Sequence, residues 1–163
     1  MHHERDASTV QAAILTMSDT RTEDEDKSGA LIGSYLEGHD HKIAAYQLIQ
    51  DDHEAIQNML TEWTSKGGID AIITNGGTGI SGKDVTYQAM KSIIHKEMEG
   101  FGELFRMKSY EEIGAKAMLS RALAGTRDQT ALFALPGSSN AVRLAMKELI
   151  LPVLPHIVGE LRK

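Results

Sequence analysis

The amino-acid sequence predicts an α/β fold, in which a mainly parallel, twisted sheet lies between helices on both of its faces. Apolar stretches of strand length alternate along the chain with segments whose apolar residues recur at helical spacing. Three polar loops, SDT, NGGTG and PGSS, follow directly after such apolar stretches. Because the carboxyl ends of parallel strands meet at one edge of a sheet, where ligands bind in this class, these loops are expected to form one site.

The first half of the chain is expected to form two units of a strand followed by a helix. Residues 11–17 (QAAILTM) are apolar and lie between polar segments, which suits a buried parallel strand. The helix that follows from Ser28 has an apolar face in SGALIGSYLEGHD and a glycine near its end. A second strand is expected at residues 41–49, and residues 55–63 carry apolar side chains at helical intervals.

The second half of the chain is expected to add two strands. Residues 69–74 (IDAIIT) lead straight into NGGTG, and residues 85–95 have the spacing of an amphipathic helix. Between residues 96 and 124 the pattern is helical but broken, with GFG as the interruption and EEIGAKAMLSRALAG as a second helix. Residues 130–135 (TALFAL) form the last expected strand, and the helix after them is expected to bend at its two prolines.

The length of 163 residues predicts one domain, residues 10–163, behind a flexible tail at residues 1–9. Hydrophobic residues make up 41% of the chain and charged residues 25%, which is the ordinary globular balance, so a core can form. His2 and His3 are interpreted as part of a frayed tail rather than as a metal site.

The chain has no cysteine, which excludes a disulfide framework, a zinc site with cysteine ligands and a thiolate nucleophile. The segment MHHERDAST has no apolar export signal, and no window reaches the ~18 to 20 apolar residues of a membrane span, so a cytoplasmic protein without a membrane partner is expected. The net charge of -6 argues against nucleic acid as a partner. An acidic protein still binds an anion locally where backbone N–H groups converge.

The glycine-rich residues 76–79 (GGTG) have two interpretations. A tight turn between a strand and a helix explains them equally well on composition alone. Their context favours an anion site, since the loop leaves an apolar strand, carries the hydroxyls of Thr78 and Ser81, and opens a helix at Asp84. The loop is neither a Walker A motif nor a Rossmann fingerprint, because it lacks the required endings and spacing.

Several acidic residues are also open to two interpretations. Asp84 suits a helix N-cap, which contributes ~1 kcal/mol and is the interpretation that the residues alone favour, and the alternative is a magnesium ligand beside a phosphate-binding loop. Asp51 and Asp52 precede a helix after a strand, so one of them is expected to be a cap. The acidic residues 23–26 are expected to be a solvated loop rather than a metal cage.

Six ordered segments together resemble one known family. They are MSDTRTEDEDKSG, IQDDHEAI, TNGGTGISGKDVT, GFGELFR, AMLSRALAG and LPGSSNAV, and they span nearly the whole chain. Their order is similar to that of the MogA/MoaB family of molybdopterin-binding proteins, to which the gephyrin G domain is related. The short chain and Ser139, where many relatives have proline, are more similar to the MoaB branch.

The resemblance implies an enzyme of molybdenum-cofactor biosynthesis. Active relatives bind molybdopterin and transfer AMP from Mg-ATP to its terminal phosphate, which gives adenylyl-molybdopterin and pyrophosphate. The resemblance also implies a homo-oligomer, either a trimer or a dimer of trimers, and contact with other molybdenum-cofactor enzymes. Two alternatives stay open: a non-catalytic carrier or scaffold for molybdopterin, and a generic α/β nucleotide-binding protein.

The resemblance assigns the catalytic and magnesium-binding roles to Asp51 and Asp84. The residues expected to bind molybdopterin or phosphate lie in the strand-end loops and near them: Ser18, Asp19, Gly76, Gly77, Thr78, Gly79, Ser81, Thr86, Ser120, Pro136, Gly137 and Ser138. The family commonly has arginine before the second aspartate, whereas this chain has Lys83, which keeps the charge but loses the planar fork of donors.

The segment 101–110 carries Phe101, Leu104, Phe105 and Met107, which is more apolar surface than a small domain readily covers. Burial against another subunit and burial in the chain's own core are equal alternatives from the sequence. The family resemblance favours the subunit interface.

Overall fold

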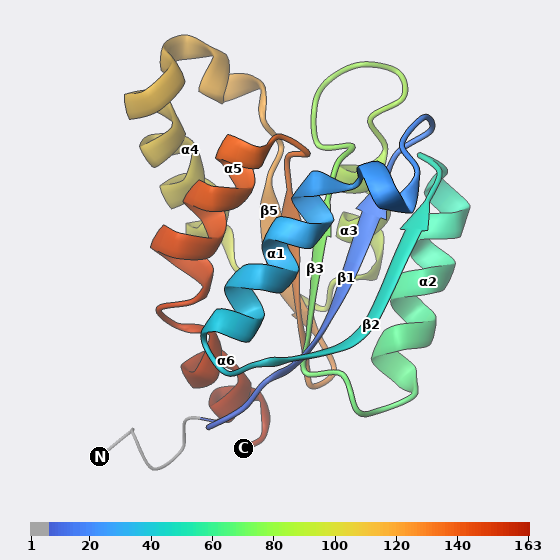
Figure 1. Cartoon of the computed structure of the whole chain (residues 1–163), viewed down its shortest axis with the longest axis vertical. Coiled ribbons are helices and arrows are strands. Elements are labelled where there is room, and N and C mark those ends of the chain that lie inside the picture. The colour runs from blue at the N-terminus through green and yellow to red at the C-terminus, as the bar shows by residue number, and fades with distance from the viewer. Residues whose placement is uncertain (1–6) are drawn as a thin grey trace.

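Residues 7–163, which the computed structural model describes, form a six-stranded sheet in the order β2-β1-β3-β6-β5-β4 (Figure 1). The strands are β1 (Gln11–Met17), β2 (Lys42–Ile49), β3 (Ala71–Asn75), β4 (Lys96–Glu97), β5 (Leu123–Arg127) and β6 (Thr130–Leu135). Strands β2, β1, β3 and β6 are mutually parallel, whereas β5 runs antiparallel to β6 and β4 antiparallel to β5. The mainly parallel α/β fold predicted from the sequence is confirmed.

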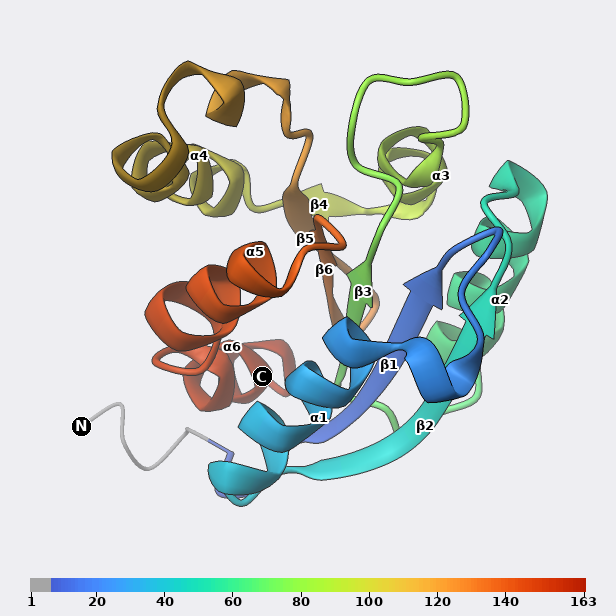
Figure 2. The ribbon, with the colours of Figure 1, turned by 45° about the horizontal axis from the view of Figure 1, so that its top comes forward.

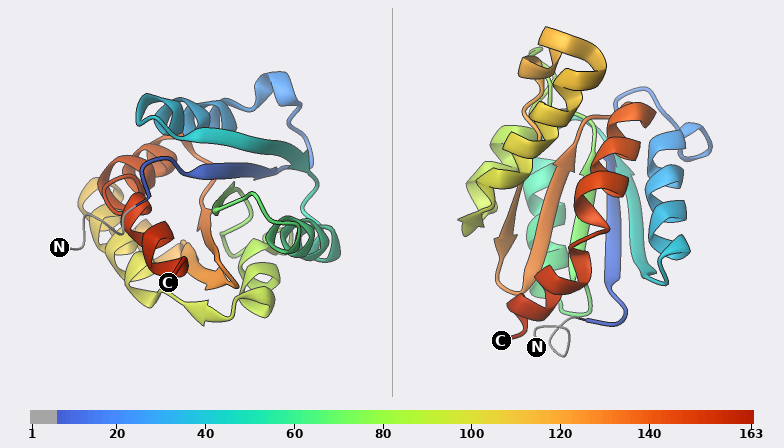
Figure 3. Two further views of the ribbon diagram at one scale, coloured as in Figure 1. Left: turned by 90° about the horizontal axis from the view of Figure 1, so that it is seen from below. Right: turned by 90° about the vertical axis from the view of Figure 1, so that its left-hand side faces the viewer.

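Helices cover both faces of this sheet (Figures 1 and 3). One face packs against α1 (Lys27–Gly38), α4 (Glu99–Ile113), α5 (Ser139–Leu144), the π-helix η4 (Ala145–Ile150) and α6 (Leu154–Leu161). The other face packs against α2 (His53–Ser65) and α3 (Thr86–Ile93). Two short 3-10 helices, η2 (Glu23–Glu25) and η3 (Gly114–Leu119), complete the elements. No helix within residues 7–163 is long and apolar enough to cross a membrane.

The two central strands explain why the apolar runs were recognisable in the sequence. All residues of β3 and β6 are buried, because helices cover both sides of the sheet there. Ile14, Ile73 and Phe133 lie in register across β1, β3 and β6 and form one row of the core beneath α1 and α5. The next residues along the strands alternate to the face covered by α2 and α3, so one sheet supports two apolar cores.

Helix ends follow the predicted signals in most places. The Asp52 side chain caps α2 by accepting from the backbone N–H of Ala55 at 2.8 Å, so one of the two adjacent aspartates is a cap as expected. The C-terminal helix is interrupted before α6, which has Pro155 in its first turn, and this confirms the predicted bend. Residues 1–6 of the predicted tail lie outside the described residues. Ala7 is buried, and its N–H donates to the carbonyl of Pro155 at 3.0 Å.

Two predictions between residues 96 and 124 are wrong. The GFG segment does not interrupt a helix, because α4 runs continuously from Glu99 to Ile113. A Cβ on Gly102 would lie 2.8 Å from the carbonyl oxygen of Ala122, so this glycine allows close packing against the chain before β5. The predicted second helix instead ends in the strand β5, since pairing with the neighbouring β6 satisfies its backbone groups. A local helical pattern is overridden there by a tertiary contact.

Candidate functional site

The loops after β1, β3 and β6 meet at one edge of the sheet, as Figure 2 shows from the side of these loops. The backbone N–H of Gly76 donates to the carbonyl of Leu135 at 2.9 Å, and Gly76 has φ +100. A Cβ on Gly76 would overlap the carbonyl oxygen of Met17, and one on Gly137 would lie 3.5 Å from the Cα of Gly76. The three strand ends therefore come together around a position that only glycine fits without strain.

Gly77 brings two more elements into the same place. It has φ +74, and a Cβ on it would overlap the Thr86 hydroxyl and lie 3.2 Å from Oδ1 of Asp51. The Thr86 hydroxyl donates to the carbonyl of Gly76 at 2.9 Å, and the Thr86 N–H donates to the carbonyl of Gly77 at 3.1 Å. Thr86, predicted as a binding residue, thus fixes the glycine loop, while Asp51 faces that loop from the end of β2.

One carboxylate oxygen of Asp51 lacks a hydrogen-bond partner, and other carboxylates lie nearby. Its Oδ1 is buried and accepts no hydrogen bond from the described residues, and its N–H donates to Oδ1 of Asp19 at 2.9 Å. Burial raises the pKa of Asp51, and the carboxylates of Asp19 and Asp84 raise it further, against the opposing effect of the Lys83 and Arg21 charges. The two neighbouring carboxylates therefore act on the pKa of Asp51 more strongly than the two neighbouring cations do.

Asp84 does not cap a helix, so that interpretation of it is wrong. Helix α3 begins at Thr86, and its N-cap residue is Val85. The Oδ2 atom of Asp84 accepts hydrogen bonds from the backbone N–H and the hydroxyl of Ser81, both at 2.9 Å. Asp84 and Ser81, both predicted site residues, therefore close the loop after the glycines together.

Arg121 holds this loop and was not recognised from the sequence. Its Nε donates to the carbonyl of Gly79 at 2.9 Å, and its Nη2 donates to the carbonyl of Asp84 at 3.0 Å. The backbone N–H of Arg121 also donates to the carbonyl of Thr78 at 2.8 Å. Because these contacts join residues about 40 positions apart, no local spacing in the sequence signals them.

The expectation that residues 23–26 form a solvated loop holds for the three exposed glutamate and aspartate residues of η2 but is wrong for Asp26. Asp26 is 3% exposed and accepts hydrogen bonds from Thr16, Tyr46, Arg21 and the N–H of Gly29. Burial alone would raise the pKa of Asp26, but these hydrogen bonds outweigh it and hold the pKa below its ordinary value. Asp26 is therefore a buried carboxylate stabilised in its charged form.

The hydroxyl groups of the predicted serine residues take part in hydrogen bonds within turns and a helix cap. Ser18 Oγ accepts from the N–H of Arg21 at 3.0 Å, and Ser138 caps α5 by accepting from the N–H of Ala141 at 3.2 Å. Ser120 lies in the chain beside Arg121 and accepts weakly from the N–H of Ala122 at 3.4 Å. Pro136 directly follows β6 and leads into Gly137.

Three buried side-chain atoms at this edge have no hydrogen-bond partner among the described residues. They are Oδ1 of Asp51, Oγ1 of Thr74 and Oδ1 of Asn75, the last two at the carboxyl end of β3. Buried polar atoms are rarely left unpaired in folded proteins, so a ligand, ion or water is expected beside them. Within residues 7–163 no group of three or more His, Asp or Glu side chains is arranged to hold a metal. One or two carboxylates are enough for magnesium when phosphate oxygens and waters supply the remaining ligands.

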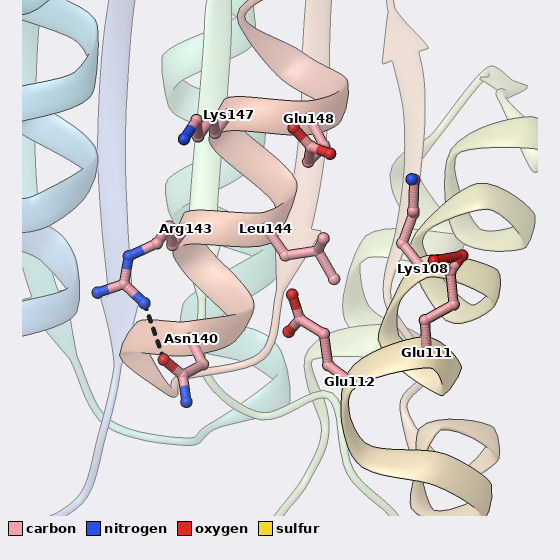
Figure 4. Close-up of a pocket in the computed structure, with 8 residues that line it drawn as sticks. All are labelled: Lys108, Glu111, Glu112, Asn140, Arg143, Leu144, Lys147 and Glu148. Carbon is pink, nitrogen blue, oxygen red and sulfur yellow. Dashed lines mark hydrogen bonds between the residues drawn. The ribbon is translucent and has the colours of Figure 1, made fainter.

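A separate cavity of about 510 Å³ lies between α4 and the helical segment α5–η4 (Figure 4). Charged side chains of both signs line it, and Arg143 bonds there to Asn140 at 2.8 Å. None of the predicted site residues lines this cavity. The unpaired buried atoms therefore place the candidate site at the loop edge and not in this cavity.

The chain is similar to proteins of molybdenum-cofactor assembly. The family described as "Probable molybdopterin binding domain" matches residues 13–156. Molybdenum cofactor biosynthesis protein B of Halalkalibacterium halodurans is 49% identical over 163 residues, which is 99% of this chain and 96% of that relative. Among solved structures, a Molybdenum cofactor biosynthesis protein B is 51% identical with a TM-score of 0.92, covering 94% of this chain and 96% of its own. The tungsten cofactor synthesizing protein MoaB from Pyrococcus furiosus is 36% identical with a TM-score of 0.84, covering 95% and 98%.

Neutralising Asp26 and neutralising Asp51 are expected to change the stability of the protein in opposite directions. The pKa of Asp26 is lowered in the folded protein, so its charge stabilises the fold above the ordinary aspartate pKa, and this contribution is lost as the pH falls through the folded value. The pKa of Asp51 is raised, so its charged form opposes folding once the pH exceeds the folded value. Asp26→Asn is expected to lower the free energy of unfolding at pH 7 and Asp51→Asn to raise it. Urea denaturation at pH 7 and pH 3 checks both signs, and the two differences from wild type are expected to shrink at pH 3.

Gly77→Ala is expected to destabilise the protein by about 2 kcal/mol or more, because the positive φ is costly for alanine and the Cβ meets Thr86. Gly82→Ala in the same loop is the matched control, since Gly82 has no positive φ and no atom within 4 Å of its Cβ position. The control is expected to change stability by at most about 0.5 kcal/mol. Equal thermal midpoints of the two variants would contradict the assigned packing.

Proposed function

The chain belongs to the family of molybdopterin-binding domains as a molybdenum-cofactor biosynthesis protein of the MoaB type, and from that membership we propose that it transfers AMP from Mg-ATP to the terminal phosphate of molybdopterin. The products are adenylyl-molybdopterin and pyrophosphate, and the expected compartment is the cytoplasm. The single observation that carries the proposal is the unpaired, buried Oδ1 of Asp51, which faces the glycine loop among two further carboxylates.

The donor set at this edge suits a magnesium ion bound with a nucleotide. Asp51 has an oxygen without a hydrogen-bond donor, and its pKa is raised by burial first and then by the negative charge of Asp19 and Asp84 nearby. Carboxylate oxygen is a hard ligand that magnesium prefers, and phosphate oxygens and waters complete its shell. Magnesium would neutralise charge on the phosphates during transfer. Asp51 and Asp84 are the residues that would hold it.

The remaining residues of the site would position the two reactants. The reaction forms a bond between a phosphate oxygen of molybdopterin and the α-phosphorus of ATP, and it breaks the bond from that phosphorus to the oxygen of the leaving pyrophosphate. Such a transfer depends on alignment and charge neutralisation, so it requires no nucleophile from the protein. Gly77 lets the backbone approach an anion closely, and Lys83 supplies an exposed positive charge beside Asp51.

In segment 101–110, some apolar side chains are buried in the chain's own core and others are exposed. Phe105 is 1% exposed and belongs to the chain's own core, whereas Leu104 and Met107 are 48% and 61% exposed. Tyr110 and Ile113 continue the exposed apolar surface along α4. Exposed apolar clusters of this kind mark interaction sites, so we propose that α4 contributes to a trimer or a dimer of trimers.

Asp51→Asn and Asp84→Asn are each expected to lower turnover about 100-fold or more, because positioned charges at such sites have effects of that size. Molybdopterin binding is expected to stay within a few-fold of wild type, since the lost interaction serves the nucleotide. Asp52→Asn is the matched control: it is adjacent to Asp51, but it is an exposed helix cap, and asparagine caps equally well.

The assay uses purified protein, molybdopterin under anaerobic conditions and Mg-ATP, and it follows adenylyl-molybdopterin by chromatography. Formation of the product by wild type and by Asp52→Asn, with loss in the other two variants, is the expected result. A wild-type protein that binds molybdopterin but forms no product would identify the carrier or scaffold function instead.

The oligomer is expected to have three or six times the 17.8 kDa mass of one chain in light scattering at micromolar concentration. Leu104→Glu with Met107→Glu should lower that mass, because both side chains are exposed in the single chain and charges there would oppose burial. Lys42→Glu is the control, because Lys42 is an exposed residue of β2, far along the sheet from α4. A wild-type mass near 17.8 kDa would refute the assembly.

A further inference from the structure

Two arginines reach the edge of the sheet that carries the proposed site, and the protein uses them differently. Arg121 spends its donors on the carbonyls of Gly79 and Asp84 and on the side chain of Gln88, and its guanidinium lies 5.0 Å from the ring centre of Tyr87. Nε and Nη2 of Arg121 are therefore engaged, and two of their three hydrogen bonds hold the glycine loop. We therefore assign Arg121 a structural role in stabilising the loop rather than a role in ligand binding.

Arg21 has most of its donors uncommitted. Its guanidinium makes one hydrogen bond within the described part of the chain, from Nη1 to Oδ1 of Asp26 at 3.0 Å. An arginine carries five N–H donors in a planar fork, so Nε and Nη2 have no acceptor among residues 7–163. The side chain is 29% exposed, which leaves these donors accessible from solvent.

The position of Nη2 is at the meeting point of the strand-end loops. It lies 3.9 Å from the place where a Cβ of Gly137 would stand, and that same place is 3.5 Å from the Cα of Gly76. The charge of Arg21 is also close enough to Asp51 to lower the pKa of that carboxyl against its other neighbours. Arg21 thus joins the loop after β1 to the loops after β3 and β6.

Arg21 is held by the carboxylate of Asp26, whose two oxygens also accept hydrogen bonds from three other donors. Oδ2 of Asp26 accepts from the hydroxyls of Thr16 and Tyr46, each at 2.6 Å, and Oδ1 accepts from the N–H of Gly29 at 2.9 Å. The Thr16 hydroxyl in turn accepts from Nδ2 of Asn75 at 2.9 Å. An N-cap needs only the bond to Gly29, so the bonds from Thr16 on β1 and Tyr46 on β2 exceed what capping α1 requires. They fix the orientation of Asp26 and therefore that of Arg21.

From this geometry we propose that Arg21 binds a phosphate group of a substrate at the meeting point of the three loops, and that Asp26 and Tyr46 are positioning residues which aim its guanidinium there. This inference rests on the proposed function, because it assigns a residue to the anion of that reaction. Guanidinium suits phosphate because its planar fork donates two parallel hydrogen bonds. Lys83 differs, since it is exposed and has no hydrogen bond that fixes it within residues 7–163.

The first test uses inorganic pyrophosphate as the probe, with calorimetric binding to the full chain in the absence of nucleotide. Arg21→Ala is expected to weaken binding about 10- to 100-fold, as for loss of a charged hydrogen bond. Arg21→Lys is expected to be intermediate, because it keeps the charge without the fork. Arg143→Ala removes an exposed arginine of α5 outside the site and serves as the control with wild-type affinity.

Tyr46→Phe tests the positioning role, because it removes one hydrogen bond to Asp26 at a distance from the anion. It is expected to weaken pyrophosphate binding a few-fold in the wild-type background and not at all in the Arg21→Ala background. A purely structural role for Tyr46 would give the same factor in both backgrounds, since independent effects add. Such additivity would overturn the positioning role.

Two further ligands distinguish the source of the phosphate. If it belongs to molybdopterin, Arg21→Ala weakens molybdopterin binding but not binding of the dephosphorylated pterin; if it belongs to ATP, the loss is seen with Mg-ATP. Pyrophosphate affinity in Arg21→Ala within twofold of wild type, or no pyrophosphate binding by wild type at millimolar concentration, overturns the inference. A protein that shows the Arg21 effect but forms no adenylyl-molybdopterin would fail the proposed function alone.

Discussion

The close meeting of three strand ends around Gly76 is the constraint on which the site depends. Strands β1, β3 and β6 end at the same edge, and a side chain at Gly76 would overlap the carbonyl of Met17. Gly77 repeats the condition one residue later, against Thr86 and Asp51. Because neither glycine carries a Cβ, polar groups from β2, β3 and α3 approach one another over a short span of backbone. Any larger residue there would separate the loops that supply the site.

This convergence places buried charge where ordinary packing would avoid it. Asp51 keeps one buried oxygen without a donor, and the carboxylates of Asp19 and Asp84 add to the unfavourable field. Asp26, a short distance along the chain from Asp19, is also a carboxylate, but four donors surround it and its pKa is lowered where that of Asp51 is raised. The hydrogen bonds of Asp26 are satisfied by the fold, whereas Oδ1 of Asp51 has no donor among the described residues, and this difference is the basis for proposing a ligand beside Asp51.

The supports of the site come from residues far apart in sequence. Arg121 reaches back to Gly79 and Asp84, and Ser28 donates its hydroxyl to the carbonyl of Gly137 at 2.6 Å. These contacts hold loops that would otherwise have only their own turns to order them. Arg121 lies just before β5, and because β5 runs antiparallel to β6, its beginning is at the same edge of the sheet as the glycine loop.

The sequence by itself determined the elements whose signals are local. Continuous apolar runs marked β1, β3 and β6, glycine and serine marked the loops after them, and the pair Asp51 and Asp52 marked the start of α2 without showing which of the two is the cap. Tertiary structure decided the remainder. Residues 123–127 became a strand because β6 lies beside them, α4 continues through GFG because Gly102 packs against the chain at Ala122, and Asp26 is buried because Tyr46 and Thr16 donate to it. Periodicity reports how a segment faces solvent, but it carries no information about which distant backbone or side chain will satisfy a polar group.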